Sequence, residues 1–174
     1  MAATVIRYER GDEYVENVYN AVTKDPKSGK EIKTAKTAHG LVGTLWVGGY
    51  AFDTLERMDG YVHLKPGEYT MSSMYDEAET GGTHGLVVNP WLGKTAEGNK
   101  QLRNILIHKG SVPSHFEGCI GPGFLEANQL TYSKESMEII WDQCGGKDRK
   151  KSIIVTLRVS GEMPALTSCR KYAG

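Results

Sequence analysis

Two neighbouring stretches, Ile105-Leu-Ile-His-Lys-Gly-Ser111 and Phe116-Glu-Gly-Cys-Ile-Gly-Pro-Gly123, bring a histidine and a cysteine together across a short, glycine-rich connection. The three aliphatic residues at 105–107 predict a buried strand that delivers His108 to its end. Glycines at 118, 121 and 123 surround the cysteine and allow a partner to approach the backbone closely. An imidazole beside a thiol is also the minimum requirement for an activated nucleophile.

The composition is that of one ordinary globular domain. The chain has 174 residues, enough to bury a core, and its 21 basic and 21 acidic residues cancel. Zero net charge disfavours a nucleic-acid binder that relies on bulk charge and leaves only a local basic patch open. No stretch is long and apolar enough for a membrane span, and the N-terminus lacks the apolar core of a signal peptide. The three cysteines form no CxxC pair, which predicts a reducing compartment rather than a disulfide framework.

Alternating and β-branched runs predict many short strands and one helix. A hairpin is expected over 43–56, where two β-rich runs flank the two-residue turn Gly48-Gly49. An N-cap at Ser133 and an apolar stripe ending at Cys144 predict a helix over about 133–145. Further strands are expected at 3–9, 61–64, 69–75, 84–90, 102–108 and 152–159. The predicted fold class is therefore mainly β, of the α+β type, with one main helix in the C-terminal half.

Residues 1–174 are interpreted as one domain with two atypical parts. Residues 12–38 look like an insertion or an extended loop, within which 12–22 fits either a strand or a short helix. The lysines at 30, 33 and 36 are most simply a solvated edge, because the overall charge is neutral. The tail, 161–174, is expected to be irregular.

Cys119 has two interpretations. A free cysteine is most often a small buried hydrophobic residue, but a thiolate stabilised by an imidazolium or by backbone amides would be a nucleophile. His108 is the first candidate base, and its alternative is a structural imidazole bonded to backbone. His115 is a second candidate base, although an exposed loop histidine is the simpler interpretation. Glu117 opposes thiolate formation unless it faces away or orients a histidine.

No metal or cofactor is expected. The possible ligands His84, His108, His115 and Cys119 include no pair with a diagnostic spacing. The segment Thr80-Gly-Gly-Thr-His-Gly85 is rich in glycine but lacks the P-loop pattern and a following helix, so no nucleotide loop is predicted there.

The order of several short motifs resembles a small family of uncharacterised phage and bacterial domains. That family combines a first strand ending in a basic residue, a hairpin containing TLE, a Pro-Gly turn before a tyrosine strand, an IH-x-G strand end, a GCI segment and a serine-capped helix. The corresponding pieces here are Ile6-Arg7, Gly43-Thr-Leu45 with Thr54-Leu-Glu56, Lys65-Pro-Gly-Glu-Tyr69, Ile107-His-Lys-Gly-Ser111, Gly118-Cys-Ile120 and Ser133. They cover the first strand and roughly residues 40–145.

The His…Gly-Cys-Ile signature is also similar to the catalytic core of the L,D-transpeptidases, cysteine enzymes that cross-link peptidoglycan. This resemblance implies Cys119 as nucleophile, His108 as its base and a backbone amide near Gly118 as oxyanion donor. The chain departs from that family at Phe116 and Gly121, where a small hydroxyl residue and an arginine are usual.

Two classes of function stay open. The first is a phage L,D-transpeptidase-like cysteine acyl transferase or peptidase that acts on peptidoglycan stem peptides, in the host cytoplasm or associated with the virion. The second is a non-catalytic phage structural, host-interaction or ligand-binding protein, in which His108 and Cys119 shape a pocket or only pack. The partners expected for it are a small ligand, a second copy of the chain or a virion component, and neither a membrane nor nucleic acid.

Overall fold

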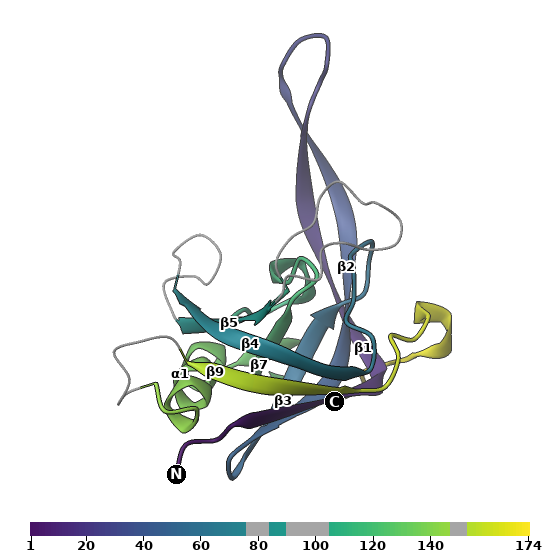
Figure 1. Cartoon of the computed structure of the whole chain (residues 1–174). Helices are drawn as coiled ribbons and strands as arrows, with labels where there is room; N and C mark the ends of the chain where they lie inside the picture. Colours follow the sequence, from purple (N-terminus) through teal and green to yellow (C-terminus); the bar gives the residue numbers. More distant parts are fainter. Residues whose placement is uncertain (76–83, 90–104, 147–152) are drawn as a thin grey trace.

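The computed structural model describes residues 1–75, 84–89, 105–146 and 153–174 (Figure 1). Strands dominate these residues, with one α-helix and two short 3-10 helices. The elements are β1 (Val5–Lys24), β2 (Glu31–Val47), β3 (Tyr50–Arg57), β4 (Gly67–Tyr75), β5 (His84–Asn89), β6 (Leu106–Ile107), η1 (Pro113–His115), β7 (Ile120–Glu126), β8 (Gln129–Thr131), α1 (Ser133–Gln143), β9 (Ile154–Ser160), η2 (Leu166–Ser168) and β10 (Arg170–Lys171).

Eight of these strands form a sheet that closes on itself. The order is β1-β2-β3-β7-β6-β5-β4-β9, and β9 returns to β1 through parallel pairing that runs from Val5 with Thr156 to Glu9 with Ser160. Two short strands lie outside this ring: β8 pairs only with β7, and β10 pairs only with β1. Closure pairs both sides of each strand in the ring, so no long sheet edge is left open around the core.

The main hydrophobic core fills the inside of the closed sheet. Alternate residues of the strands point inward, and Ile6, Leu45, Ile107 and Ile120 are fully buried there. Helix α1 packs against β5 and β7, and its apolar stripe, which includes Ile140, joins the same core. Cys144 on this stripe is buried in the same core, and this burial raises the pKa of its thiol to about 11.

A second, smaller cluster lies apart from the main core. Its buried members come from β1, β3, β6, β8 and the segment around η1: Val15, Leu55, Leu106, Phe116, Cys119 and Leu130. Leu106 lies between Ile105 and Ile107 of the main core, so its side chain projects from the opposite, outer face of the sheet. Leu55 lies between Thr54 and Glu56, which share the inner face with Phe52, so it projects outward as well. Segment 109–119 covers this outer face.

Strands β1 and β2 continue far beyond the body as a two-stranded arm (Figure 1). We define the hairpin arm as residues 18–37, in which seven antiparallel pairs run from Val18 with Thr37 to Lys24 with Glu31. None of its residues is buried. At the tip, Asp25 accepts hydrogen bonds from the amide of Lys27 at 2.8 Å and from the hydroxyl of Ser28 at 3.0 Å.

The predicted fold class, mainly β with one main helix, is confirmed, and so is the hairpin that turns at Gly48-Gly49. The strand predicted at 61–64 is wrong: this segment is irregular, and its burial comes from packing of Leu64 into the core. Residues 12–38 are strands and a turn. The tail is not wholly irregular, because it contains η2 and β10.

Helix α1 begins without the predicted cap. The N-cap position is Tyr132, in the left-handed conformation with φ of 53°, and no side chain caps the helix. The Ser133 hydroxyl instead accepts a hydrogen bond from the Gly110 amide at 3.1 Å. The first residues of the strand predicted at 102–108 and most of the glycine-rich segment 80–85 lie outside the described residues.

Candidate functional site

The pairing of β6 with β7 brings the predicted histidine and cysteine to the same side of the sheet. The two strands are parallel, and Ile107 stands opposite Ile120 with both side chains in the main core. Side chains alternate between the faces of a strand. His108 follows Ile107 and Cys119 precedes Ile120, so both project from the outer face.

Both side chains are nearly inaccessible on that face. Cys119 is 5% exposed and packs in the second hydrophobic cluster, where its Sγ lies 4.0 Å from the carbonyl oxygen of Glu117. His108 is 8% exposed, and its Nδ1–H donates to the carbonyl of Lys109 at 2.7 Å. Burial lowers the pKa of His108, because the imidazolium form loses its hydration. A neutral imidazole with Nδ1 protonated presents Nε2 as its only proton acceptor.

The Phe116 ring occupies the space next to two of the glycines near His108 and Cys119. Its fully buried ring lies 5.2 Å, centroid to centroid, from the His108 ring. A Cβ atom at Gly110 or at Gly121 would collide with this ring. The two departures from the transpeptidase pattern are therefore coupled, since Phe116 occupies the space beside Gly121 where a longer side chain would lie. The close approach that the glycines allow is made by a side chain of the same chain.

The backbone around Gly118 forms a tight turn. Gly118 has φ of +81°, and its amide donates to the carbonyl of Phe116 at 3.0 Å. A Cβ atom there would meet the Cβ of Tyr61 at 3.0 Å. In this conformation the Gly118 amide is engaged within the turn and does not point at an oxyanion.

His115 lines a hollow next to the pair. This hollow, of about 510 Å³, lies between the Lys109–Ser111 segment and the start of α1, and its lining includes neither His108 nor Cys119. His115 is exposed, and its Nδ1 accepts a hydrogen bond from the Ser111 amide at 3.0 Å. The structure therefore brings His108 and Cys119 to one face, whereas His115 belongs to the adjoining surface.

Sequence reasoning missed a charged network buried inside the closed sheet. Arg10 and Glu56 form a bidentate ion pair, with Nε–Oε1 at 2.8 Å and Nη2–Oε2 at 2.9 Å, and each side chain is 1% exposed. The Tyr8 hydroxyl donates to the same carboxylate at 2.7 Å, and His63 Nδ1 lies 3.8 Å from it. Burial and the nearby Glu56 charge raise the pKa of Tyr8 well above its ordinary value.

A sequence signal for this network exists. Ile6, Tyr8 and Arg10 alternate along β1, so a buried Ile6 places Arg10 on the same inner face. The glutamate of the TLE motif occupies the equivalent face of β3. Because charged residues are almost never fully buried without a partner, an inward arginine and an inward glutamate should be assigned to each other.

Comparison of the chain with protein-family models, with curated proteins and with solved structures gives no match. Within the described ranges, no helix has the length and apolar character needed to cross a membrane.

Proposed function

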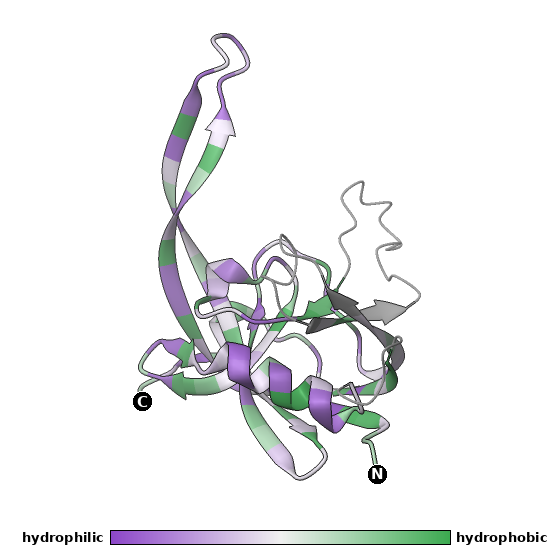
Figure 2. Ribbon diagram, turned by 90° about the vertical axis from the view of Figure 1, so that its left-hand side faces the viewer, coloured by the Kyte–Doolittle hydropathy of each residue, from purple (hydrophilic) through white to green (hydrophobic). Residues whose placement is uncertain are grey.

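We propose that this protein is a non-catalytic interaction protein, of the phage structural class that the motif order suggests, and that its hairpin arm docks on a second copy of the chain. The observation that carries this proposal is the exposure of the arm. Val18, Val22 and Ile32 are 70%, 53% and 47% exposed, and Figure 2 shows apolar residues interspersed with polar ones along both strands of the arm.

The hairpin arm has little to stabilise it within a single copy of the chain. An isolated two-stranded hairpin is marginally stable in water at best, and seven of its residue pairs extend past the body without any third strand. Its outer edges present unpaired backbone groups, which are templates for pairing with another chain. Docking would cover the exposed valines and isoleucine and satisfy these backbone groups.

Charge complementarity favours a second copy as the partner. The hairpin arm contains five lysines and two acidic residues, a net charge of +3. The whole chain has 21 basic and 21 acidic residues, so the remainder has 16 and 19, a net charge of −3. An arm therefore attracts the body of another copy, whereas arm-to-arm contact is repulsive. Reciprocal exchange of arms between two copies gives a closed dimer, whereas head-to-tail docking of arms generates rings or filaments.

Sedimentation velocity over a range of protein and salt concentrations tests this proposal. The wild type is expected to assemble and to dissociate as salt rises. A variant in which Asn-Gly replaces residues 19–36 closes the hairpin with a two-residue turn and should stay monomeric. Reversal of charge at Lys33 and Lys36 should weaken assembly, and the exposed Lys65→Glu serves as the matched control. A wild type that stays monomeric at the highest concentration would contradict the proposal.

A cysteine acyl transferase is the second candidate, and the β6–β7 register favours it because it places His108 and Cys119 on one face. In that reaction the Cys119 thiolate attacks a stem-peptide carbonyl, and a thioester forms. The leaving amine takes the proton that His108 removed from the thiol, and water or another amine then resolves the thioester. Phe116 would have to move to admit the substrate.

The alkylation rate of Cys119 with iodoacetamide across pH, measured by peptide mapping, separates the two candidates. A catalytic thiol is alkylated rapidly even at a pH well below ~8.5, the ordinary pKa of cysteine, and its alkylation slows in His108→Ala. A thiol that is protected in both proteins excludes the transferase in this form.

A further inference from the structure

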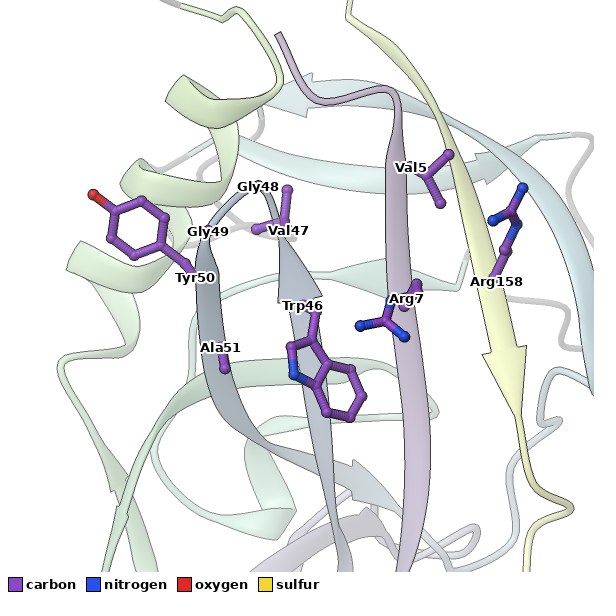
Figure 3. Close-up of a pocket in the computed structure, with 9 residues that line it drawn as sticks. All are labelled: Val5, Arg7, Trp46, Val47, Gly48, Gly49, Tyr50, Ala51 and Arg158. Atoms are coloured by element: carbon purple, nitrogen blue, oxygen red, sulfur yellow. The ribbon is translucent and has the colours of Figure 1, made fainter. Parts of the chain in front are cut away.

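A second hollow, of about 340 Å³, lies on the outside of the closed sheet beside the β2–β3 turn (Figure 3). Its lining consists of Val5, Arg7, Trp46, Val47, Gly48, Gly49, Tyr50, Ala51 and Arg158. The volume falls at the lower end of the range of about 300–1,000 Å³ typical of small-molecule sites. Both charged residues in the lining are arginines.

Strand register sets the two arginines side by side. Arg7 of β1 stands directly opposite Arg158 of β9 and, on its other side, opposite Trp46 of β2. Like charges directly opposite each other in a sheet are destabilising. Arg158 is compensated, because its Nε lies 2.7 Å from Glu68 Oε1 on β4.

Arg7 lacks such a carboxylate partner among the described residues. Its guanidinium instead lies over the Trp46 ring, 4.9 Å from the ring centroid. Figure 3 shows the guanidinium directed toward the indole and Arg158 on the far side of Arg7. Arg7, Arg158 and Glu68 together therefore carry one excess positive charge, next to the half-buried ring of Trp46.

A small residue lies beside Trp46 on the side away from Arg7. Ala51 of β3 stands opposite Trp46 there, so that side carries no large neighbouring side chain from β3 (Figure 3). Guanidinium groups bind phosphate in a bidentate manner, and aromatic side chains stack on nucleobases irrespective of base identity. The pocket thus combines a phosphate-binding pair with a stacking surface.

We propose that this pocket binds a mononucleotide, with its phosphate on Arg7 and Arg158 and its base on Trp46. This site is separate from the hairpin arm and from the His108–Cys119 face. Because bulk charge is zero, recognition depends on these three side chains and not on the field of the whole protein.

Isothermal titration calorimetry at low salt tests the proposal with AMP, adenosine, ribose 5-phosphate and inorganic phosphate as probes. AMP is expected to bind more tightly than each of the other three. Arg7→Gln should weaken AMP binding by about tenfold, the loss expected for one charged phosphate contact. Trp46→Leu should weaken AMP by about tenfold, as for one stacked base, and leave inorganic phosphate unchanged.

Two exposed positions supply controls. Glu68→Gln removes the carboxylate that competes for Arg158 and should tighten AMP binding. Arg170→Gln removes an exposed arginine that pairs with Asp12 elsewhere on the surface and should change nothing. The proposal is overturned if AMP does not saturate the wild type, or if its affinity is the same in Arg7→Gln and Trp46→Leu as in the wild type.

Discussion

Phe116 is the residue that most affects the surroundings of His108 and Cys119. The ring fills the space that Gly110 and Gly121 leave, lies against His108 and packs in the cluster that contains Cys119. The thiol and the imidazole are thereby sealed from solvent. The same glycines that permit a substrate to approach backbone in an enzyme here admit an aromatic side chain.

Phe116→Ala is expected to destabilise the fold by about 3–5 kcal/mol, the usual cost of removing a buried phenylalanine. The variant should also accelerate alkylation of Cys119, because the thiol loses its cover. Urea denaturation and peptide mapping measure the two effects. Phe124→Ala, at a ring that is 45% exposed, is the control and should cost much less. Unchanged protection of Cys119 would show that other residues seal it.

The Arg10–Glu56 pair is the second feature at this scale. Glu56→Gln leaves the Arg10 guanidinium buried without a full counter-charge, which costs about 3–5 kcal/mol in comparable buried pairs. Urea denaturation should show this loss. The matched control is Glu68→Gln. The side chains of Arg158 and Glu68 are 53% and 63% exposed, so loss of this ion pair should lower the free energy of unfolding by about 1 kcal/mol at most. Equal effects at the two sites would mean that the buried pair is not structurally important.

Among the elements, β1 and β2 each have two parts with different stabilities. The inner parts pair within the closed sheet and contribute Ile6, Tyr8, Leu41 and Leu45 to the buried interior. The outer parts form the hairpin arm, in which no residue is fully buried. Local stability follows buried apolar contact, so one continuous ladder should open in two stages.

Hydrogen exchange measured by mass spectrometry tests this difference. In dilute protein, where arms are unpartnered, amides of 18–24 and 31–37 should exchange rapidly, and those of 41–47 should exchange only through global unfolding. At concentrations that favour assembly, the arm should become protected. Equal protection of both parts in the dilute monomer would contradict this account.

For the whole molecule, closure of the sheet creates an interior that excludes charge unless the charge is paired. His63, next to Glu56 inside the sheet, shows the consequence, because burial lowers its pKa below the ordinary value. His108 shows the same effect on the outer face, where burial beside Phe116 lowers its pKa. For His63 the nearby Glu56 opposes this shift but does not cancel it.

The free energy of unfolding should therefore fall as pH drops below about 6.5, the ordinary pKa of histidine. Below this pH the unfolded chain binds protons at both histidines that the native protein does not yet bind. The loss continues until the pH reaches the lowered native values, at up to about 1.4 kcal/mol per pH unit for each histidine. Urea denaturation between pH 7.5 and 5.5 measures it.

His63→Gln and His108→Gln should each flatten this profile, because each variant removes one buried imidazole. Stability that is constant or that increases toward pH 5.5 would contradict the assignment of both histidines as buried neutral groups.

Local patterns determined much of this protein. Alternation and β-branched residues indicated most strands, Gly48-Gly49 marked a hairpin turn, and the apolar stripe ending at Cys144 located α1. These features depend on neighbouring residues, so periodicity and turn chemistry reveal them. The same patterns indicated His108 at a strand end and Cys119 in the glycine-rich segment that follows as candidate partners.

Only the tertiary structure decided which distant segments meet. The parallel return of β9 to β1 sets Arg7 beside Arg158, separated by most of the chain. The closure of the sheet joins Arg10 to Glu56, and the fold of 109–119 lays Phe116 on Gly121. Strand partners are chosen by the collective burial of all inward side chains, a quantity that no local window contains. Residue pattern therefore specified most of the elements and indicated His108 and Cys119 as candidates, and collective packing specified the cover over these two residues, the arginine pocket and the exposed arm.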